Sequence, residues 1–300
     1  MTDQAEAVKF HTGYIAIVGR PNVGKSTLLN KLVGQKLSIT SRKPQTTRQR
    51  ITGIVTLDDA QLLFVDTPGF QKKHASALNR SMNRSVTQAL AAVDVVLMVV
   101  EADHFSDDDR AVMALLPAGR PVLLAINKTD RLKERGALLP FIEKITKHRA
   151  FDEVIPISAT KGHAVDTLGK VIAKYLPLAP AIYTEDEITE SSERFLAAEM
   201  VREKLFRLLG DELPYGCAVL IERFVMEGTM RRISGSIIVD KESHKGIVVG
   251  AKGSRLREIG TLARLDMQKL FDGKVHLELW VRVKNGWSDS DRALKQLGYD

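Results

Sequence analysis

Cysteine is almost absent from this sequence, which has a single one, Cys217, among its 300 residues. One cysteine excludes an intrachain disulfide and a cysteine-rich zinc site, and it fits a reducing compartment. A long hydrophobic run is also lacking, because the longest apolar stretch, residues 95–100, is far shorter than a membrane span. Residues 1–10 contain no apolar segment of a signal peptide, so we expect a soluble protein without a cleaved leader or a membrane helix.

Charge is unevenly distributed along the chain. The formal net charge is +7, and residues 1–180 alone carry 25 basic and 17 acidic side chains. Residues 181–222 hold 4 basic and 10 acidic side chains, whereas residues 223–274 hold 11 and 6. With 44% hydrophobic residues the chain can form two packed domains. The basic segment of the second one suggests a face that binds an anionic partner.

Short apolar runs alternate with longer amphipathic segments up to about residue 175, which predicts an α/β domain with a mostly parallel sheet. We expect strands at 14–18, 51–57, 62–65, 95–100, 122–126 and 154–157, and helices at 26–33, 77–92, 108–115, 136–148 and 164–175. The pattern then changes to a helix at 194–209, strands at 218–225, 231–239 and 275–283, and a terminal helix at 289–297. The expected division is a first domain of residues 1–177, a linker of residues 178–190 and a smaller α+β domain of residues 191–300.

Residues 19–26 follow the first expected strand and read Gly-Arg-Pro-Asn-Val-Gly-Lys-Ser, which fits the phosphate-loop pattern G-x-x-x-x-G-K-[ST]. The glycines let backbone N–H groups and the following helix N-terminus point at phosphates. Lys25 would pair with the β- and γ-phosphates, and the Ser26 hydroxyl would ligate Mg²⁺. Taken alone, the segment also fits a glycine-rich turn. Its expected nucleotide contacts are Gly19, Asn22, Val23, Gly24, Lys25, Ser26 and Thr27.

A second motif, Asp-Thr-Pro-Gly at residues 66–69, comes at the end of another apolar strand. Folds with a phosphate loop place such an Asp toward the metal and such a Gly N–H toward the γ-phosphate. Parallel strands bring their carboxyl ends to one edge of the sheet, where α/β folds bind ligands. Asp66 and Gly69 should therefore lie close to the phosphate loop.

A third motif, Asn-Lys-Thr-Asp at residues 127–130, predicts recognition of guanine. The carboxylate of Asp130 can accept hydrogen bonds from N1–H and the exocyclic amine of guanine, and adenine would leave it unpaired. Lys128 would lie along the purine plane, and Asn127 would tie this loop to the phosphate loop. Backbone N–H groups of Ser158 and Ala159, which follow the last expected strand, would reach the guanine O6.

The order of these motifs resembles a GTPase of the translation-factor-related class. Residues 41–48 (Ser-Arg-Lys-Pro-Gln-Thr-Thr-Arg) resemble the first switch of that class, in which a Thr caps Mg²⁺ and the γ-phosphate. Thr47 is the first choice for this role and Thr46 the second. The resemblance thus gives Ser26, Thr47 and Asp66 as the metal ligands.

Phe70 stands where Ras-type proteins carry the Gln that orients the attacking water. Phenylalanine cannot hydrogen-bond water, so unaided hydrolysis should be slow. No residue is assigned as a direct catalyst, and Thr47 and Gly69 are candidate positioning residues. Related GTPases with a hydrophobic residue at this place suggest that Asn22 helps to hold a K⁺ ion beside the phosphates.

Residues 246–260 contain a Gly-Ala-Lys-Gly loop between an apolar segment and an amphipathic run. Two expected strands precede it and one follows, an order that resembles a type II KH domain. Such a domain clamps about four nucleotides of single-stranded RNA at a G-x-x-G loop. A helix–turn–helix core element with solvated basic residues is the alternative. The expected RNA contacts are Ile247, Val248, Gly250, Ala251, Lys252, Gly253, Ser254, Arg255 and Arg257, and Ile247, Val248 and Ile259 would line or support the groove.

A GTPase with Phe70 joined to a type II KH domain resembles the bacterial Era family over essentially the whole chain. The resemblance implies GTP or GDP with Mg²⁺ as ligands and slow GTP hydrolysis. It also implies binding to the 3′ region of 16S ribosomal RNA, a role in assembly of the 30S subunit, a monomer, and a cytoplasmic location with peripheral association with the inner membrane. Two other functions stay open from the residues alone: an RNA chaperone with a non-catalytic nucleotide site, and a membrane-surface GTPase.

Overall fold

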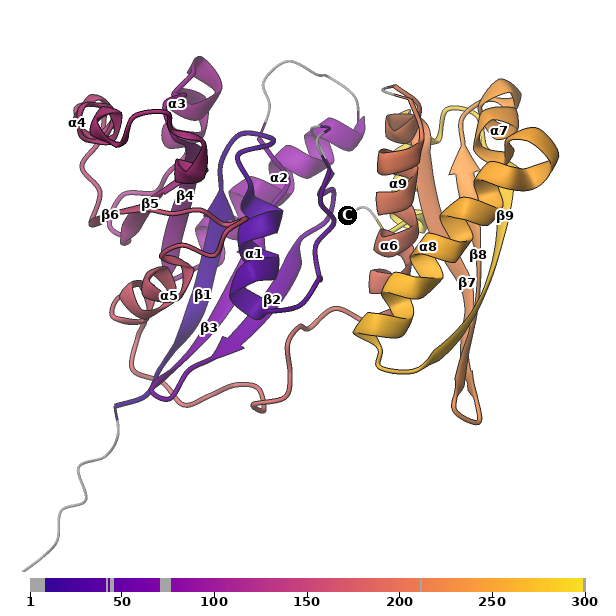
Figure 1. The fold of residues 1–300 in the computed structure, drawn as a ribbon, viewed down its shortest axis with the longest axis horizontal. Helices are drawn as coiled ribbons and strands as arrows, with labels where there is room; N and C mark the ends of the chain where they lie inside the picture. Colours follow the sequence, from indigo (N-terminus) through magenta and orange to yellow (C-terminus); the bar gives the residue numbers. More distant parts are fainter. Residues whose placement is uncertain (1–8, 42, 44–45, 71–76, 211, 299–300) are drawn as a thin grey trace, which may run out of the picture.

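The computed structural model describes residues 9–41, 43, 46–70, 77–210 and 212–298, and Figure 1 shows two α/β parts side by side. The first part contains β1 (His11–Val18), α1 (Lys25–Val33), β2 (Ile51–Thr56), β3 (Ala60–Asp66), α2 (Ala77–Ala92), β4 (Val95–Glu101), α3 (Asp107–Met113), β5 (Val122–Asn127), α4 (Leu138–Thr146), β6 (Glu153–Pro156) and α5 (Val165–Ala173). The second part contains α6 (Glu193–Leu208), β7 (Cys217–Glu227), β8 (Met230–Val239), α7 (Glu242–Val249), α8 (Ser254–Leu270), β9 (Lys274–Val283) and α9 (Asp291–Gln296).

Six strands form the sheet of the first part, in the order β2-β3-β1-β4-β5-β6. All neighbouring strands are parallel except β2 and β3, which are antiparallel. Only residues 57–59 separate these two strands, and so short a connection allows a hairpin but not the crossover that a parallel pair needs. The sequence thus predicts a mostly parallel sheet but not which strand reverses.

Helices cover both faces of this sheet because its central strands are apolar up to their last residues, Glu101 of β4 and Asn127 of β5 (Figure 1). One face packs against α1 and α5, through side chains such as Leu28 and Leu168. The other face packs against α2, α3 and α4, through Val86, Val112 and Ile145. Helix α2 has the predicted bounds, whereas α4 is shorter than expected at both ends.

The second part has the sheet β7-β8-β9, in which β7 and β8 are antiparallel and β8 and β9 are parallel. The parallel pair requires a crossover, which α7 and α8 supply. Alternate residues of β9 are exposed, and the intervening ones pack against the buried core. The expected α+β arrangement is confirmed.

Residues 177–190 run along the first part and are held to it by backbone hydrogen bonds. The amide of Thr12 donates to Pro177, and the amide of Ile54 donates to Ile188. Gln61 accepts from two further amides of this segment through its side-chain oxygen. The segment between the two parts is therefore ordered along the first part, and we call its residues 178–190 the strap.

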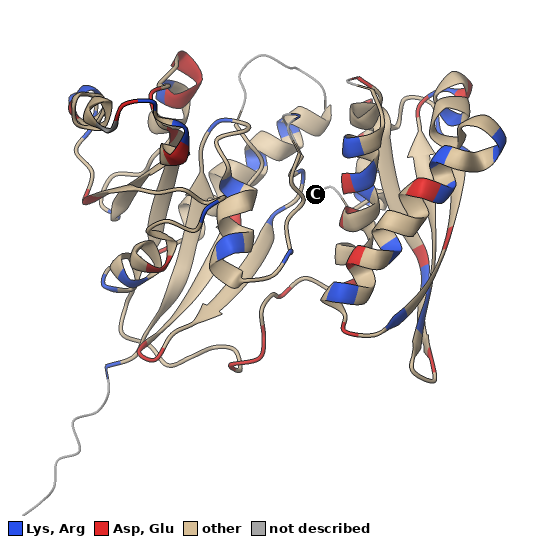
Figure 2. Ribbon diagram, in the orientation of Figure 1, with Lys and Arg blue, Asp and Glu red and all other residues tan. Residues whose placement is uncertain are grey.

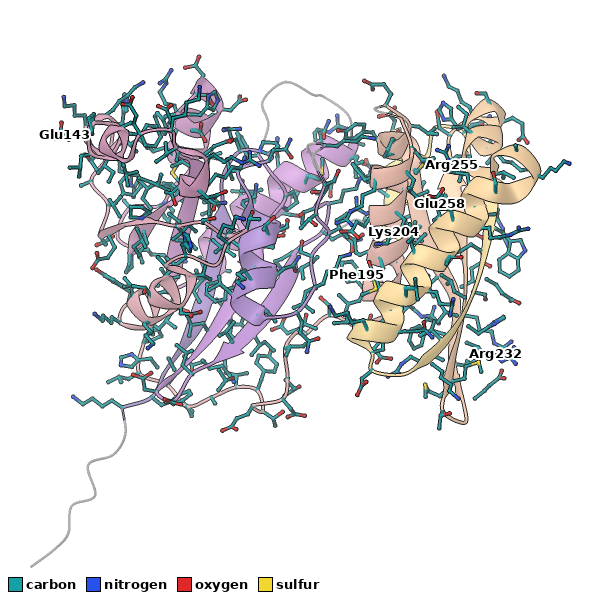
Figure 3. All side chains as sticks on the ribbon, viewed as in Figure 1. Glu143, Phe195, Lys204, Arg232, Arg255 and Glu258 are labelled. Carbon is teal, nitrogen blue, oxygen red and sulfur yellow. The ribbon has the colours of Figure 1, made fainter. Side chains whose placement is uncertain are left out.

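Side chains from both parts meet along α6 and α8. Lys36, just after α1, binds Glu203 of α6 at 2.5 Å and Asp266 of α8 at 2.6 Å. Lys204, labelled in Figure 3, contacts the same two carboxylates, and Figure 2 shows the mixed charges of these helices. An apolar cluster also joins the parts, formed by Ala77, Leu78, Met82, Ala218, Ile238, Trp287, Ala293 and Leu294. Within the described part of the chain, no helix is both long and apolar enough to cross a membrane.

Candidate functional site

A cavity of about 450 Å³ lies at the carboxyl-terminal edge of the six-stranded sheet. It is the edge at which the phosphate-loop, Asp-Thr-Pro-Gly and Asn-Lys-Thr-Asp motifs were expected to meet. The lining residues are Pro21, Asn22, Gly24, Lys25, Ser26, Thr27, Ile39, Thr40, Ser41, Thr46, Thr47, Gly69, Asn127, Lys128, Arg131 and Thr160. The structure therefore brings together motifs that lie more than 100 residues apart in the sequence.

Lys25 begins α1 at the floor of this cavity and is buried. Its ammonium group donates to the carbonyl oxygens of Gly19 at 2.9 Å and Arg20 at 3.0 Å. Burial lowers the pKa of Lys25 to about 8, although the nearby carboxylate of Asp66 favours the charged form. Among the described residues its hydrogen-bond partners are carbonyl oxygens, and such a buried cation is suited to binding an anion such as a phosphate.

Asp66, at the end of β3, is fully buried beside Lys25, and burial raises the pKa of its carboxyl group despite the opposing charge of Lys25. Its Oδ2 atom accepts hydrogen bonds from Ser26 Oγ and Ser38 Oγ, both at 2.8 Å, and from Thr47 Oγ1 at 3.3 Å. Its Oδ1 atom is buried and has no hydrogen-bond partner among the described residues.

These oxygens fit a bound Mg²⁺ ion, because Mg²⁺ prefers hydroxyl, carboxylate and phosphate oxygens. Ser26 Oγ and Thr47 Oγ1 are 2.9 Å apart and both contact Oδ2 of Asp66, whose Oδ1 is buried without a partner among the described residues and so lacks the interaction that a cation supplies. Both threonines line the cavity, and Thr47 is the one whose hydroxyl contacts Ser26 and Asp66. Ser38 was missed by the sequence analysis because a single Ser outside any motif gives no signal.

Gly69 lies against the phosphate loop, which explains why this position has no side chain. A Cβ atom there would come within 2.9 Å of the backbone nitrogen of Pro21. The next residue, Phe70, packs its ring against the apolar core on the α2 side of the sheet. Of the expected first switch, Arg42, Pro44 and Gln45 lie outside the described residues.

The Asn-Lys-Thr-Asp motif, residues 127–130, begins a loop that we call the base-recognition loop. Asn127 joins it to the phosphate loop, as expected. Its Nδ2 donates to the carbonyl of Val23 at 2.8 Å, and its Oδ1 accepts from the amide of Ala159 at 2.9 Å. The amide of Ser158 donates to the carbonyl of His163. Both amides thus donate within the loop, and their contact with guanine stays a prediction. Thr160, the next residue, lines the cavity.

Asp130 is exposed and is not in the lining of the cavity, although its neighbours Lys128 and Arg131 are. Ser158 Oγ donates to Asp130 Oδ1 at 2.5 Å, and this hydrogen bond lowers the pKa of the carboxyl group. Asp130 is therefore ionised at neutral pH and has acceptor capacity left for a ligand.

An ion-pair network beneath the site was missed by the sequence analysis. Glu101, at the end of β4, binds Lys128 Nζ at 2.9 Å and Arg20 Nη2 at 2.9 Å. Arg20 also binds Asp109, whose side chain is buried, at 3.1 Å. Burial opposes charge on Glu101, but hydrogen bonds from Lys128 and Arg20 outweigh it and lower the pKa of the carboxyl group. Glu101 thus connects the phosphate loop to the base-recognition loop.

The Gly-Ala-Lys-Gly loop of the second part connects α7 to α8 through the short turn η4 (Ala251–Gly253). Gly250 has a φ of 72°, and a Cβ there would lie 2.7 Å from Cβ of Arg255. Ala251 and Lys252 are exposed at the tip of the loop. The loop therefore presents backbone to solvent at the start of a 17-residue helix.

A groove of about 320 Å³ runs beside this loop, between α8 and β9. It is lined by Gly253, Leu256, Arg257, Gly260, Thr261, Arg264, Leu277 and Leu279. Val248 and Ile259 are completely buried and so support the groove from below, and Ile247 is exposed outside it. The apolar lining is instead formed by Leu256, Leu277 and Leu279, which the sequence analysis did not select.

The basic residues near the loop differ in orientation. Arg257 lines the groove, and Lys252 is exposed at the loop. Arg255, labelled in Figure 3, instead donates to the carbonyl of Leu208 at 2.6 Å, at the end of α6. The expectation that Arg255 meets phosphates is therefore corrected, because this side chain stabilises the packing of α8 on α6.

Comparison with known proteins matches a different family to each of two segments of the chain. Residues 14–128 match the family described as 50S ribosome-binding GTPase, and residues 212–288 match the KH domain. GTPase Era of Nitrosomonas eutropha is 53% identical over 291 residues, which cover 97% of this chain and 98% of that protein. This chain belongs to the GTPase Era family. GTPase Era of Chromobacterium violaceum is 54% identical with the same coverage.

Two solved Era structures have the fold of this chain over almost its full length. A variant of Aquifex aeolicus Era bound to GDP and AlF4⁻ has a TM-score of 0.93 and 40% identity, and covers 97% of this chain and 99% of that one. Era in complex with MgGDPNP and nucleotides 1506–1542 of 16S ribosomal RNA gives the same values. This Era-family chain therefore has a P-loop GTPase domain followed by a KH domain.

Proposed function

We propose that this chain binds GTP in the 450 Å³ cavity and hydrolyses it slowly. The observation that carries the proposal is the buried cluster of Ser26, Thr47 and Asp66, with one carboxylate oxygen unpaired. In this proposal these three residues hold Mg²⁺, which neutralises charge that develops on the phosphates. Lys25 binds the β- and γ-phosphates, and the Gly69 amide binds the γ-phosphate.

Guanine would lie at the other end of the cavity. Asp130, which is ionised, accepts its N1–H and exocyclic amine, and the stem of Lys128 covers the purine plane. Asn127 keeps the base loop and the phosphate loop at a fixed separation. Phe70 has no polar atom and packs into the core, so the protein positions the attacking water through Thr47 and the Gly69 backbone.

The second part would bind single-stranded RNA in the groove between α8 and β9. Bases lie on Leu256, Leu277 and Leu279, and the backbone passes the exposed loop at Ala251 and Lys252. Relatives named Era, one of them solved with nucleotides 1506–1542 of 16S ribosomal RNA, support that region as the target. The role that follows is assistance in assembly of the 30S ribosomal subunit by a nucleotide-controlled RNA-binding protein.

Several finer points belong to the same proposal. The domain borders are residues 1–177 and 191–300, with the strap of residues 178–190 between them. The protein acts as a monomer in the cytoplasm and associates peripherally with the inner membrane. Asn22, which lines the cavity, helps to hold K⁺, and turnover in KCl and NaCl at equal ionic strength tests that role.

The RNA-binding loop can be tested without disturbing the nucleotide site. Replacing Ala251 and Lys252 by Asp puts negative charge where phosphates pass, so RNA affinity should fall at least tenfold while GTP affinity is unchanged. Lys295→Asp with Gln296→Asp makes the same change in charge on exposed positions of α9 and is the matched control.

Binding is measured with an RNA of the sequence of nucleotides 1506–1542 and with liposomes of anionic lipid in parallel. In cells depleted of the protein, the control pair should restore 30S assembly and the loop pair should not. Wild-type RNA affinity in the loop pair would contradict the KH assignment. Binding of wild-type protein to liposomes but not to RNA would favour a membrane-surface GTPase.

A further inference from the structure

Arg48 belongs to the first part by sequence, but its side chain is buried in the second part, with 3% of its surface exposed. Its Nη1 donates to the carbonyl of Cys217 at 2.8 Å, and its Nη2 donates to the carbonyls of Pro214 at 3.2 Å and Tyr215 at 2.9 Å. The guanidinium carbon lies 5.9 Å from the ring centres of both Phe206 and Trp287. We call these three carbonyls and two rings the Arg48 socket.

The socket is specific for a guanidinium group. Three carbonyls around one side chain match the planar, forked donors of Arg, which also stack on aromatic rings, whereas a Lys ammonium has one nitrogen to offer. The wall of the socket is itself fixed, because Trp287 Nε1 donates to the carbonyl of Gly216 at 3.1 Å. The second part thus holds Arg48 in one orientation.

Thr47 immediately precedes Arg48, but its side chain contacts the first part of the molecule and not the second. It is 2.9 Å from Ser26 Oγ and 3.3 Å from Asp66 Oδ2, in the cluster assigned to Mg²⁺. On the other side, the carbonyl of Thr46 accepts a hydrogen bond from Arg202 of α6, which is paired with Glu199. Contacts with the second part therefore fix the backbone on both sides of Thr47.

We propose that Arg48 is a positioning residue for GTP hydrolysis: the Arg48 socket holds Thr47 where it completes the Mg²⁺ and γ-phosphate site. The inference rests on the proposed function. Fixing Thr47 in advance lowers the ordering cost of reaching the reactive arrangement, and misplacement by about 1 Å can cost ~100-fold in rate. GDP lacks the γ-phosphate that Thr47 would cap. Loss of the socket should therefore weaken binding of GTP but not of GDP.

The first test replaces Arg48 by Ala or Lys, with Arg50→Ala as the control, because Arg50 is exposed two residues further along the same segment. Calorimetry with GDP and with a non-hydrolysable GTP analogue, in the presence of Mg²⁺, gives the ratio of the two affinities. We expect both Arg48 variants to lose about tenfold in this ratio and at least tenfold in kcat, and the control to match the wild type. Equal ratios in the Arg48 and Arg50 variants would overturn the proposal, and so would a rise in kcat.

A second variant acts from the far side of the interface and guards against misfolding of the Arg48 variants. Trp287→Phe keeps a ring beside Arg48 but removes the hydrogen bond to Gly216. It should lower the same affinity ratio by about threefold, because the socket wall loosens. If Trp287→Phe lowers thermal stability but leaves the affinity ratio unchanged, the socket has a purely structural role and the proposal is overturned. If wild-type protein fails to bind or hydrolyse GTP, the proposed function itself is wrong, so the two failures are distinguishable.

Discussion

Replacing Glu101 by Gln should weaken nucleotide binding although Glu101 lies beneath the site and not in its lining. Its carboxylate binds Lys128 and Arg20, both at 2.9 Å, and these two side chains are only 17% and 14% exposed. Removing a hydrogen bond to a charged group costs ~1.5–3 kcal/mol. Gln keeps one acceptor oxygen, so we expect about half of that cost, ~0.8–1.5 kcal/mol, which is ~4–13-fold in affinity.

Calorimetric titration measures this loss for GDP and for a non-hydrolysable GTP analogue. Both should weaken equally, because the base that Lys128 would cover in the proposed complex is common to the two. Glu143→Gln is the control, since Glu143 is exposed on the outside of α4 (Figure 3). Affinities within twofold of each other in the Glu101 and Glu143 variants would refute the reasoning. A double-mutant cycle with Lys128→Met should give a coupling energy of ~1 kcal/mol.

The same carboxylate predicts a pH dependence of stability. Burial alone would raise the pKa of Glu101 in the folded protein. Lys128 and Arg20 outweigh this effect through their hydrogen bonds and their positive charges, so the pKa is lowered. The folded state therefore binds this proton less tightly than the unfolded state, and the stabilisation is fully present above the ordinary value of 4.5. The difference in unfolding free energy between wild type and the Gln variant should shrink as pH falls below 4.5.

Two other changes separate recognition from packing. Asp130→Asn replaces an acceptor by a group that can donate, so GTP affinity should fall and xanthosine triphosphate affinity should rise; unchanged GTP binding without that gain would refute the base assignment. Phe70→Ala removes a half-buried ring from the α2 side of the core, so unfolding free energy should fall by ~1–2 kcal/mol while kcat stays within about threefold. A drop in kcat of about 100-fold at unchanged stability would show that Phe70 acts in the reaction.

The sequence predicts the nucleotide site well because its parts are local. Each motif combines an apolar strand with a loop that follows it directly, and the parallel sheet brings these loops to one edge. Asp66 and Asn127, for example, are the last residues of β3 and β5. Their hydrogen bonds to Ser26 and Val23 follow from that placement.

Residues that act through tertiary contacts were not predictable in the same way. Ser38 reaches Asp66, and Glu101 reaches Arg20 and Lys128, but neither Ser38 nor Glu101 belongs to a motif. The socket of Arg48 is harder still, because its hydrogen-bonding partners are backbone carbonyls, which every residue has. An Arg just before a strand gives little information in the sequence, because its burial and its partners depend on the tertiary fold.

The strap and the Arg48 socket together limit how the two parts can move. Hydrogen bonds hold the strap as far as Thr189, whose hydroxyl donates to the carbonyl of Thr52, and α6 is capped by Ser192. Glu190 accepts hydrogen bonds from the hydroxyls of Tyr14 and Tyr183, and the amide of Ser191 donates to Thr189 Oγ1, so a hinge between the two parts would lie next to Ser192. A rotation there moves α6 and the socket as one body, since Phe206 belongs to α6 and contributes a ring to the socket. The second part therefore cannot rotate away from the first without removing the socket from Arg48. Movement of the second part and the position of Thr47 are thus coupled.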